Sequence, residues 1–379
     1  MRIEEAGHEE VIVPLDLQWS ERMVLSVMEE NPVPWERSFG DRKYWNYTDG
    51  LVLTGINELY KTTRNSQYGN IILDYLNAHK DGIPGYKANH YNIDMINTGK
   101  LLFDVYKKTG DTSYLHTLKM LRTQLSDQPR TESGGFWHKK IYPNQMWLDG
   151  LYMGLPFYTR YTMTFENGEN LNDIIHQFDL IQKNNLDEKT GLLYHGWDES
   201  KKMEWADKRT GTSPQFWSRS LGWYMMALVD VLDYFPKDHK GRVKLINYLN
   251  TLSTSLVKYQ DPSGLWFQVP DKGSLGENYL EASGSLMFAY AFAKGAKKGY
   301  LPQFFLDVAN NTFDGVLKNL IEVNDDGHLY LNQICSSAGL GGNPYRDGSF
   351  RYYTKEAKQV VNDPHGTGSF ILAALELGR

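Results

Sequence analysis

Six segments of the chain open in the same way, and this recurrence constrains the fold more than any other feature of the sequence. In each, a loop rich in Tyr and Trp ends at a small or acidic residue and continues into an apolar stretch with helical spacing. These inner segments run from Trp45 to Tyr60, Tyr91 to Tyr106, Met146 to Tyr161, Phe216 to Phe235, Leu280 to Gly295 and His365 to Gly378. Small residues near their starts, such as Gly50, Thr98 and Gly284, allow close packing.

Six more polar helical segments alternate with these, each with charge on one face and Leu or Ile on the other. They run from Leu17 to Glu30, Tyr68 to Lys80, Ser113 to Leu125, Leu171 to Asn184, Gly241 to Gln260 and Leu301 to Glu322. The alternation predicts an all-α fold, an (α/α)6 barrel in which six outer helices surround six inner ones.

The links between the segments are uneven. Those from an inner helix to the next outer helix are short, whereas those from outer to inner are long and contain a Gly-aromatic element. The elements are GGFW at Gly134, GLLYHGW at Gly191, GLWF at Gly264 and GHLYL at Gly327, and each predicts a short strand or β-hairpin. All long loops then emerge at one end of the barrel, which we expect to hold the active site.

The regular repeat also predicts that residues 1–379 form a single domain, with residues 1–15 as an extended N-terminal segment. No apolar run is long enough to cross a membrane, and the N-terminus lacks a signal-like pattern. A cytoplasmic location is the simplest expectation; an exported, periplasmic protein without its signal would look the same. We expect a monomer or a weak homo-oligomer.

Charge and cysteine content exclude several functions. The net charge is −6, with acidic and basic residues interspersed, which argues against nucleic acid as a partner. The single cysteine, Cys335, excludes an internal disulfide and a cysteine-based metal cage, and no pair of histidines has metal-ligand spacing. The sequence therefore predicts neither a metal nor a cofactor.

The 13% aromatic content suits stacking on sugar rings, although it suits a thick core equally well.

The starts of the inner helices carry most of the candidate site residues. In a barrel these positions converge, although they lie far apart in sequence: Tyr47, Asp49, Asp94, Asp149, Trp217, Arg219, Glu281 and His365, joined by Lys139, Trp147, His195, Trp197 and Trp266 from the loops. Acids at a barrel mouth favour glycoside chemistry. Asp94 and Asp149 begin adjacent inner helices, and two nearby carboxylates raise each other's pKa, so we expect one of them to hold a proton at neutral pH.

Each candidate also has a purely structural interpretation. Asp149 and Asp49 could cap their helices, and an isolated His195 is more often a packing or surface residue. Arg219 inside an apolar helix must find an anion, which could be an internal partner or a substrate carboxylate. Trp147 and Trp217 are, by themselves, more often core residues than sugar platforms.

Five motifs in order resemble the unsaturated rhamnogalacturonyl hydrolases, glycoside hydrolase family 105, which are related to the unsaturated glucuronyl hydrolases. They are NIDMINTG around Asp94, MWLDGLYMG around Asp149, YHGWDES around His195, FWSRSLGWYMMALVDVL around Arg219 and CSSAGLGG around Cys335. The resemblance implies an (α/α)6 barrel with Asp149 as catalytic acid and base and Asp94 as the second active-site aspartate. It implies that His195, Trp217, Arg219, Tyr47, Lys139 and Trp147 bind the sugar.

The implied substrate is an unsaturated uronyl oligosaccharide, the galacturonyl-rhamnose product of a pectin lyase. Protonated Asp149 donates to C4 of the C4–C5 double bond, water adds at C5, and the ring opens to release the aglycone. Two other functions stay open. One is an ordinary inverting glycosidase that uses Asp94 and Asp149, and the other is a non-catalytic glycan-binding toroid.

Overall fold

Inner and outer helices alternate along the chain. The computed structural model describes residues 12–30, 45–80, 82–83 and 86–379, so most of the expected N-terminal segment, residues 1–11, lies outside the described residues. The outer helices are α1 (Trp19–Glu30), α3 (Ser66–Asn77), α6 (Thr112–Asp127), α8 (Leu171–Asn185), α10 (Lys240–Val257) and α12 (Phe304–Asn319). The inner helices are α2 (Tyr47–Thr63), α4 (Asp94–Asn97) with its continuation α5 (Leu102–Thr109), α7 (Leu148–Phe165), α9 (Ser218–Leu232), α11 (Ala282–Lys297) and α13 (Pro364–Leu377).

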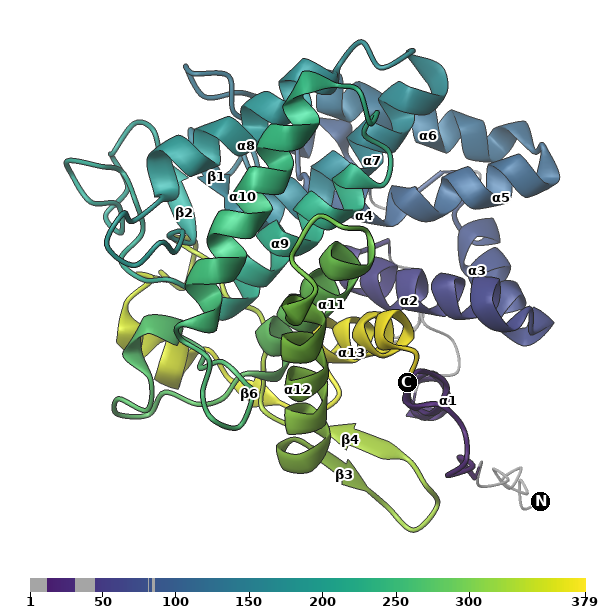
Figure 1. The fold of residues 1–379 in the computed structure, drawn as a ribbon. Helices are drawn as coiled ribbons and strands as arrows, with labels where there is room; N and C mark the ends of the chain where they lie inside the picture. Colours follow the sequence, from purple (N-terminus) through teal and green to yellow (C-terminus); the bar gives the residue numbers. More distant parts are fainter. Residues whose placement is uncertain (1–11, 31–44, 81, 84–85) are drawn as a thin grey trace, which may run out of the picture.

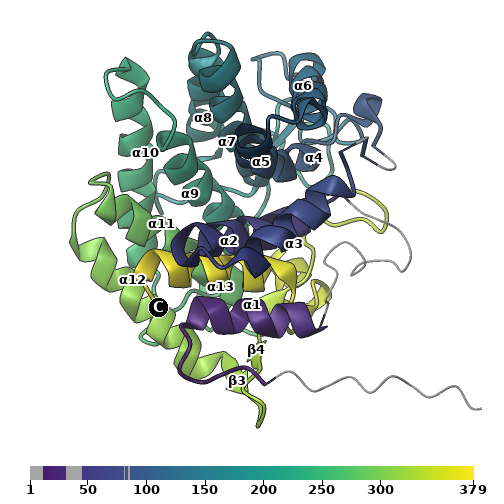
Figure 2. The same cartoon turned by 90° about the vertical axis from the view of Figure 1, so that its right-hand side faces the viewer.

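The inner helices close into a ring. Contacts run from α2 to α4, α7, α9, α11 and α13 in turn, and α13 returns to α2 (Figure 1). Figure 2 shows α13 between α1 and α2, and the C-terminal residue is fixed there because Ser20 Oγ donates to the carbonyl of Arg379. The predicted (α/α)6 toroid is confirmed.

Burial explains why the two sets of helices differ in composition. Every residue of α9 except Asp230 is buried, as is nearly all of α11, because these inner helices lie between the outer ring and the axis. The outer helix α10 buries only a stripe that includes Leu245, Leu249 and Leu252. Apolar inner helices and amphipathic outer helices follow directly from this arrangement. No helix within the described ranges combines the length and the apolar character needed to cross a membrane.

The second inner helix is the exception to the predicted pattern. The continuous helix expected from Tyr91 to Tyr106 is wrong, because a 3-10 turn, η3 (Thr98–Leu101), separates α4 from α5. At this point Thr98 Oγ1 donates to the carbonyl of Asn46, and Gly50 of α2 packs so closely that an added Cβ would collide with the Thr98 side chain. The close approach to α2 accompanies the tightened turn.

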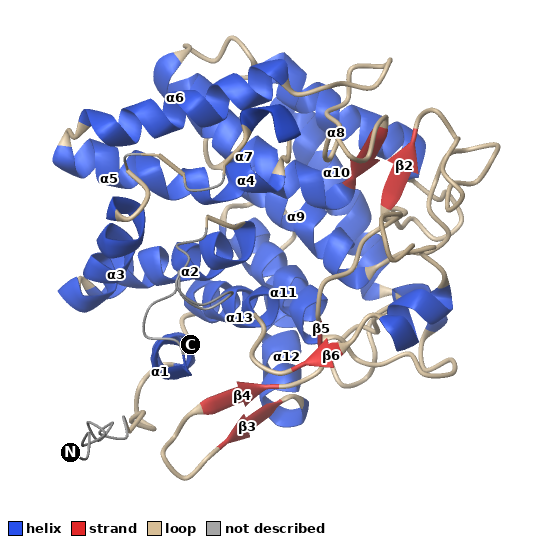
Figure 3. Ribbon diagram, turned by 180° about the vertical axis from the view of Figure 1, so that it is seen from behind, coloured by secondary structure: helices blue, strands red, loops and turns tan. Residues whose placement is uncertain are grey.

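The strands are short and lie in the connections between helices (Figure 3). They are β1 (Gln145–Trp147), β2 (Gly196–Asp198), β3 (Ile321–Val323), β4 (Leu329–Leu331), β5 (Ile334–Cys335) and β6 (Gln359–Val360). Gly134, Gly191, Gly264 and Gly327 all have positive φ and form turns. The strand predicted after each turn is found only after Gly191 (β2) and Gly327 (β4); after Gly134 and Gly264 the chain forms isolated bridges, Arg130–Phe136 and Phe267–Leu280. Only β3 and β4 form a local hairpin among the named strands, however, since β1 pairs with β2 from the following long loop.

Candidate active site

The pairing of β1 with β2 brings Asp149 to His195. Trp147 lies opposite Gly196 in antiparallel register, and the backbone N–H of Leu148 donates to the carbonyl of His195. Helix α7 begins at the next step, with Asp149 in its first turn. Trp147, and not Asp149, occupies the N-cap position; Asp149 lies in the first turn, where the helix dipole also favours a carboxylate.

Asp149 and His195 form the closest acid–base pair of the site. His195 Nε2 lies 3.1 Å from Asp149 Oδ2, and neither atom has a hydrogen bond to any other described group. His195 Nδ1 lies 2.7 Å from the hydroxyl of Tyr353, which fixes the ring. Burial raises the pKa of Asp149, but His195 and then His138 outweigh it, so the pKa lies below its usual value. The pair can therefore share one proton.

Asp94 pairs with one lysine and faces one histidine. Lys139 Nζ lies 2.6 Å from Asp94 Oδ2, and His138 Nε2 lies 3.4 Å from Asp94 Oδ1. Burial lowers the pKa of His138 to about 4, so its ring is neutral at pH 7. The expectation that Asp94 keeps Asp149 protonated is wrong for the free protein, because Lys139 pairs with Asp94 and His195 lowers the pKa of Asp149.

Tyr47 is oriented by a histidine and an acid. Its hydroxyl lies 2.9 Å from His365 Nε2, and His365 Nδ1 lies 2.5 Å from Asp363 Oδ1. Burial and Arg219 lower the pKa of His365, so the neutral ring is expected near pH 7. The Asp363 carboxylate can only accept, which places the proton on Nδ1. Tyr47 must then donate to Nε2, and its oxygen is left to accept from a ligand.

The same tyrosine shows that the two aspartates share one site. Burial, and next Asp94, raise the pKa of Tyr47; Arg219 lowers it, and Asp149 raises it further. Charges act on a phenol in this way only at short range. Geometry supports this for the two aspartates, since His138 lies 3.4 Å from Asp94 Oδ1 and packs against Gly150, the residue after Asp149. A shared site with Tyr47 and Arg219 stays a prediction.

Arg219 contributes positive charge to the site. Its Nη atoms donate to the carbonyls of Cys335 and Ser336, and the guanidinium lies 4.7 Å from the centre of the Trp217 ring. These hydrogen bonds go to neutral carbonyl groups. Burial lowers the pKa of Arg219, but Cys335, Glu281 and Asp363 raise it above its usual value, so the nearby carboxylates partly balance the guanidinium charge. Its buried Nε–H has no hydrogen-bond partner among the described residues. Arg219 thus has internal partners and still attracts a carboxylate.

The tryptophans lie behind the polar groups. Trp217 is 1% exposed and packs against His195 at 4.9 Å, while Trp147 stacks on His138 at 4.4 Å. In this state both rings contact protein groups, so their role in stacking on a sugar stays a prediction. Trp266 is a core residue that packs on Phe288, which contradicts its expected place at the rim.

Two acids of the expected set are engaged with the backbone or a neighbouring side chain. Asp49 accepts from Asn46 Nδ2 at 2.7 Å, next to the cap that Asn46 provides for α2. Glu281 is fully buried and accepts from the N–H groups of Gly284 and Cys335 and from the hydroxyl of Ser283. Both acids are structural in this arrangement.

Glu281→Ala is expected to lower the free energy of unfolding by about 3 kcal/mol or more, because it leaves three buried donors without an acceptor. Urea unfolding at neutral pH measures the loss. Glu322→Ala, at an exposed glutamate, is the control and is expected to change stability by less than about 0.5 kcal/mol. Equal stability of the two variants would contradict the assignment.

Asp363→Asn tests the acid that orients Tyr47. Burial raises the pKa of Asp363, but His365 lowers it to about 2 from the usual 3.8. The folded-state pKa is depressed, so the carboxylate stabilises the fold above about pH 4 and loses this effect as pH falls toward 2. Near pH 5 the variant is expected to be about 2 kcal/mol less stable, and the deficit should vanish by about pH 2. Urea unfolding curves of both proteins between pH 2 and pH 5 measure the difference in stability. A difference that does not change with pH would contradict the pairing of Asp363 with His365.

Sequence reasoning missed three groups that complete the site. His138, Tyr353 and Asp363 each contact a predicted site residue, yet none was singled out. For Asp363 a signal exists, because the acid precedes Pro364 at a helix start and caps α13 through its side chain. Tyr353 has no such signal, since it reaches His195 from a short π-helix, η5 (Tyr352–Glu356), 158 residues away.

The chain matches the family model described as Glycosyl Hydrolase Family 88 over residues 19–379. Its fold superposes with a TM-score of 0.91 on a glycoside hydrolase of family 105 from C. acetobutylicum, with 44% sequence identity over 96% of this chain and 99% of that chain.

Two curated relatives are more distant. The unsaturated rhamnogalacturonyl hydrolase YesR of Bacillus subtilis is 28% identical over 273 residues, which is 69% of this chain and 74% of that protein. The unsaturated 3S-rhamnoglycuronyl hydrolase of Formosa agariphila is 24% identical over 347 residues, which is 88% of this chain and 84% of that protein.

Proposed function

Because the chain belongs to glycoside hydrolase family 105, within the group that also holds family 88, we propose that it removes the terminal 4,5-unsaturated galacturonyl residue from lyase-generated rhamnogalacturonan oligosaccharides. The observation that carries the proposal is the buried Asp149–His195 pair, whose facing atoms have no other hydrogen-bond partner among the described residues. A single acid beside a histidine suits the hydration of a vinyl ether, which needs one proton donor and water but no nucleophilic side chain.

The proton moves through Asp149. Protonated Asp149 donates to C4 of the double bond, which leaves a cation at C5 that the ring oxygen stabilises. The Asp149 carboxylate then accepts a proton from the water that attacks C5, and the resulting hemiketal opens to release the aglycone. The pKa of Asp149 is lowered in the free protein, and the carboxylate of the bound sugar raises it by like-charge repulsion.

The neighbouring groups hold the sugar. The guanidinium of Arg219, whose Nε–H has no hydrogen-bond partner among the described residues, attracts its carboxylate, and the hydroxyl oxygen of Tyr47 accepts from a sugar hydroxyl. Asp94 and Lys139, joined at 2.6 Å, present an acceptor and a donor side by side. The Tyr353 hydroxyl keeps the His195 ring facing Asp149.

A second substrate class is supported by the relative from Formosa agariphila, which is named an unsaturated 3S-rhamnoglycuronyl hydrolase. The two candidate substrates share the unsaturated uronyl group and differ in the aglycone. An assay of lyase-generated disaccharides distinguishes the two substrates. It compares the products from rhamnogalacturonan, ulvan and glycosaminoglycan and follows the loss of the double-bond absorbance. We expect the highest kcat/KM for the rhamnogalacturonan product and no turnover of a saturated disaccharide. Equal turnover of the saturated compound would favour the ordinary inverting glycosidase.

A further inference from the structure

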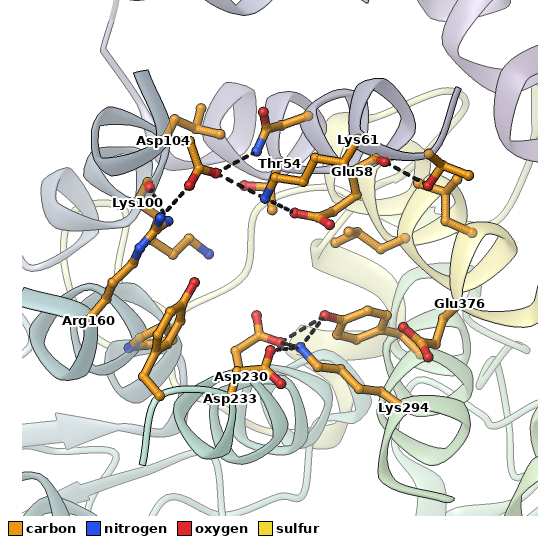
Figure 4. A pocket seen from close by; sticks show the side chains of 18 of the residues that line it. Thr54, Glu58, Lys61, Lys100, Asp104, Arg160, Asp230, Asp233, Lys294 and Glu376 are labelled. Carbon is orange, nitrogen blue, oxygen red and sulfur yellow. Dashed lines mark hydrogen bonds and ion pairs between the residues drawn. The ribbon is translucent and has the colours of Figure 1, made fainter. Parts of the chain in front are cut away.

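A cavity of about 380 Å³ lies at the end of the barrel opposite Asp149 (Figure 4). All six inner helices contribute to it from the middle or the C-terminal half, for example through Thr54, Lys100, Arg160 and Tyr290. Arg160 follows Asp149 by 11 positions on α7 (160 − 149), which is about 16 Å along a helix. The cavity is therefore separate from the site described above, and its volume falls within the range of about 300–1,000 Å³ typical of small-molecule sites.

Most charges on its walls are paired with each other. Asp104 accepts from Arg160 and lies 3.0 Å from Lys61 Nζ. Lys294 Nζ lies 2.7 Å from Asp230 and 2.6 Å from Asp233. These pairs neutralise one another within the protein and need no ligand.

Lys100 is different. Its Nζ is buried and has no hydrogen-bond partner among the described residues; its closest aromatic contact is the Tyr152 ring, 4.0 Å from Nζ to the ring centre. Figure 4 shows the side chain reaching from η3 toward the central space. Burial lowers the pKa of Lys100 to about 8, so the group is still mostly charged at pH 7. The charges of Asp230 and Glu58 act on this ammonium, but neither carboxylate forms a hydrogen bond with Nζ, so a ligand carboxylate in direct contact with Nζ would stabilise it further.

We propose that this cavity binds a small sugar acid, a hydroxylated monocarboxylate whose carboxylate pairs with Lys100. One unpaired cation matches one negative charge, whereas a multiply charged anion would meet Asp230 and Glu376 on the facing walls. The negative ends of the inner-helix dipoles also disfavour excess anionic charge. The Tyr290 hydroxyl already donates to Asp230 and accepts from Lys294, but the hydroxyl oxygen of Thr54 and the amide oxygen of Asn57 remain able to accept from the hydroxyl groups of a ligand. The proposal does not depend on the activity proposed for Asp149.

Residue-specific labelling tests the site directly. We would modify the full-length protein by reductive methylation at pH 8 and follow individual lysines by peptide mass mapping. D-galacturonate is the probe, D-galactose is its uncharged control, and Lys244, at the surface beside Asp179, is the internal reference. Galacturonate is expected to slow the methylation of Lys100 by at least tenfold and to leave Lys244 unchanged, and galactose should protect neither. Protection should persist in Asp149→Asn, because the label reports on the cavity alone.

Lys100→Met provides the second measurement. It keeps a long apolar stem and removes the charge, so the variant should fold and hydrolyse substrate at the wild-type rate. Its calorimetric affinity for galacturonate at this site is expected to fall by about tenfold or more. In the wild type, that affinity should weaken by about tenfold per pH unit above pH 8, as Lys100 loses its proton. Failure of galacturonate to protect Lys100, or a Lys100 that is never methylated, would overturn the proposal.

Discussion

Asp149→Asn is expected to lower kcat on the unsaturated disaccharide by at least about a thousandfold, with little change in folding. An amide cannot donate a carboxylic proton to C4, and it cannot accept the proton of the attacking water, so both steps lose their catalyst. Asn keeps the size of the side chain in the first turn of α7. The rate of double-bond loss, measured beside the thermal unfolding temperature, gives the result. A folded variant with activity within tenfold of the wild type would contradict the role of Asp149.

Asp94→Asn is expected to lower kcat by about a hundredfold and to raise KM. The carboxylate holds Lys139 at 2.6 Å and faces His138, so its loss leaves the lysine charge uncompensated and moves two groups of the site. The effect is smaller than for Asp149 because Asp94 positions the sugar and does not itself transfer the proton.

Asp104→Asn is the matched control for both variants. Asp104 is also paired with a lysine and an arginine, but it lies at the opposite end of the barrel. Its loss should reduce stability and leave kcat near the wild-type value. If Asp104→Asn and Asp94→Asn reduced activity equally, general destabilisation and not the active site would explain the loss.

The outer helices could be predicted from the sequence because burial on one face imposes a helical period of apolar residues. The inner helices could be predicted because they are apolar over nearly their whole length. The break at η3 could not, since it accompanies the contact between Thr98 and Asn46 of the neighbouring segment. The ring closure follows from alternation alone, and it explains why the predicted positions of Asp94 and Asp149 converge.

The charge partners within the site were harder to predict. Asp149 was expected to hold a proton because another acid lies near, yet the pairing of β1 and β2 gives it His195 instead. Arg219 binds backbone carbonyls, which have no sequence signature. Lys100 and Lys294 interrupt otherwise apolar inner helices, and these two lysines were a sequence signal for the cavity at the end of the barrel opposite Asp149.

The central claim is that water adds to C5 of the unsaturated sugar after protonation at C4. A single turnover in H2¹⁸O, with immediate borohydride reduction of the carbonyl groups and mass spectrometric fragmentation of the product, locates the new oxygen. The account predicts ¹⁸O at C5, because the hemiketal forms there and the ring oxygen leaves with C1. Label at C1 would show direct attack at the anomeric carbon and would contradict the account.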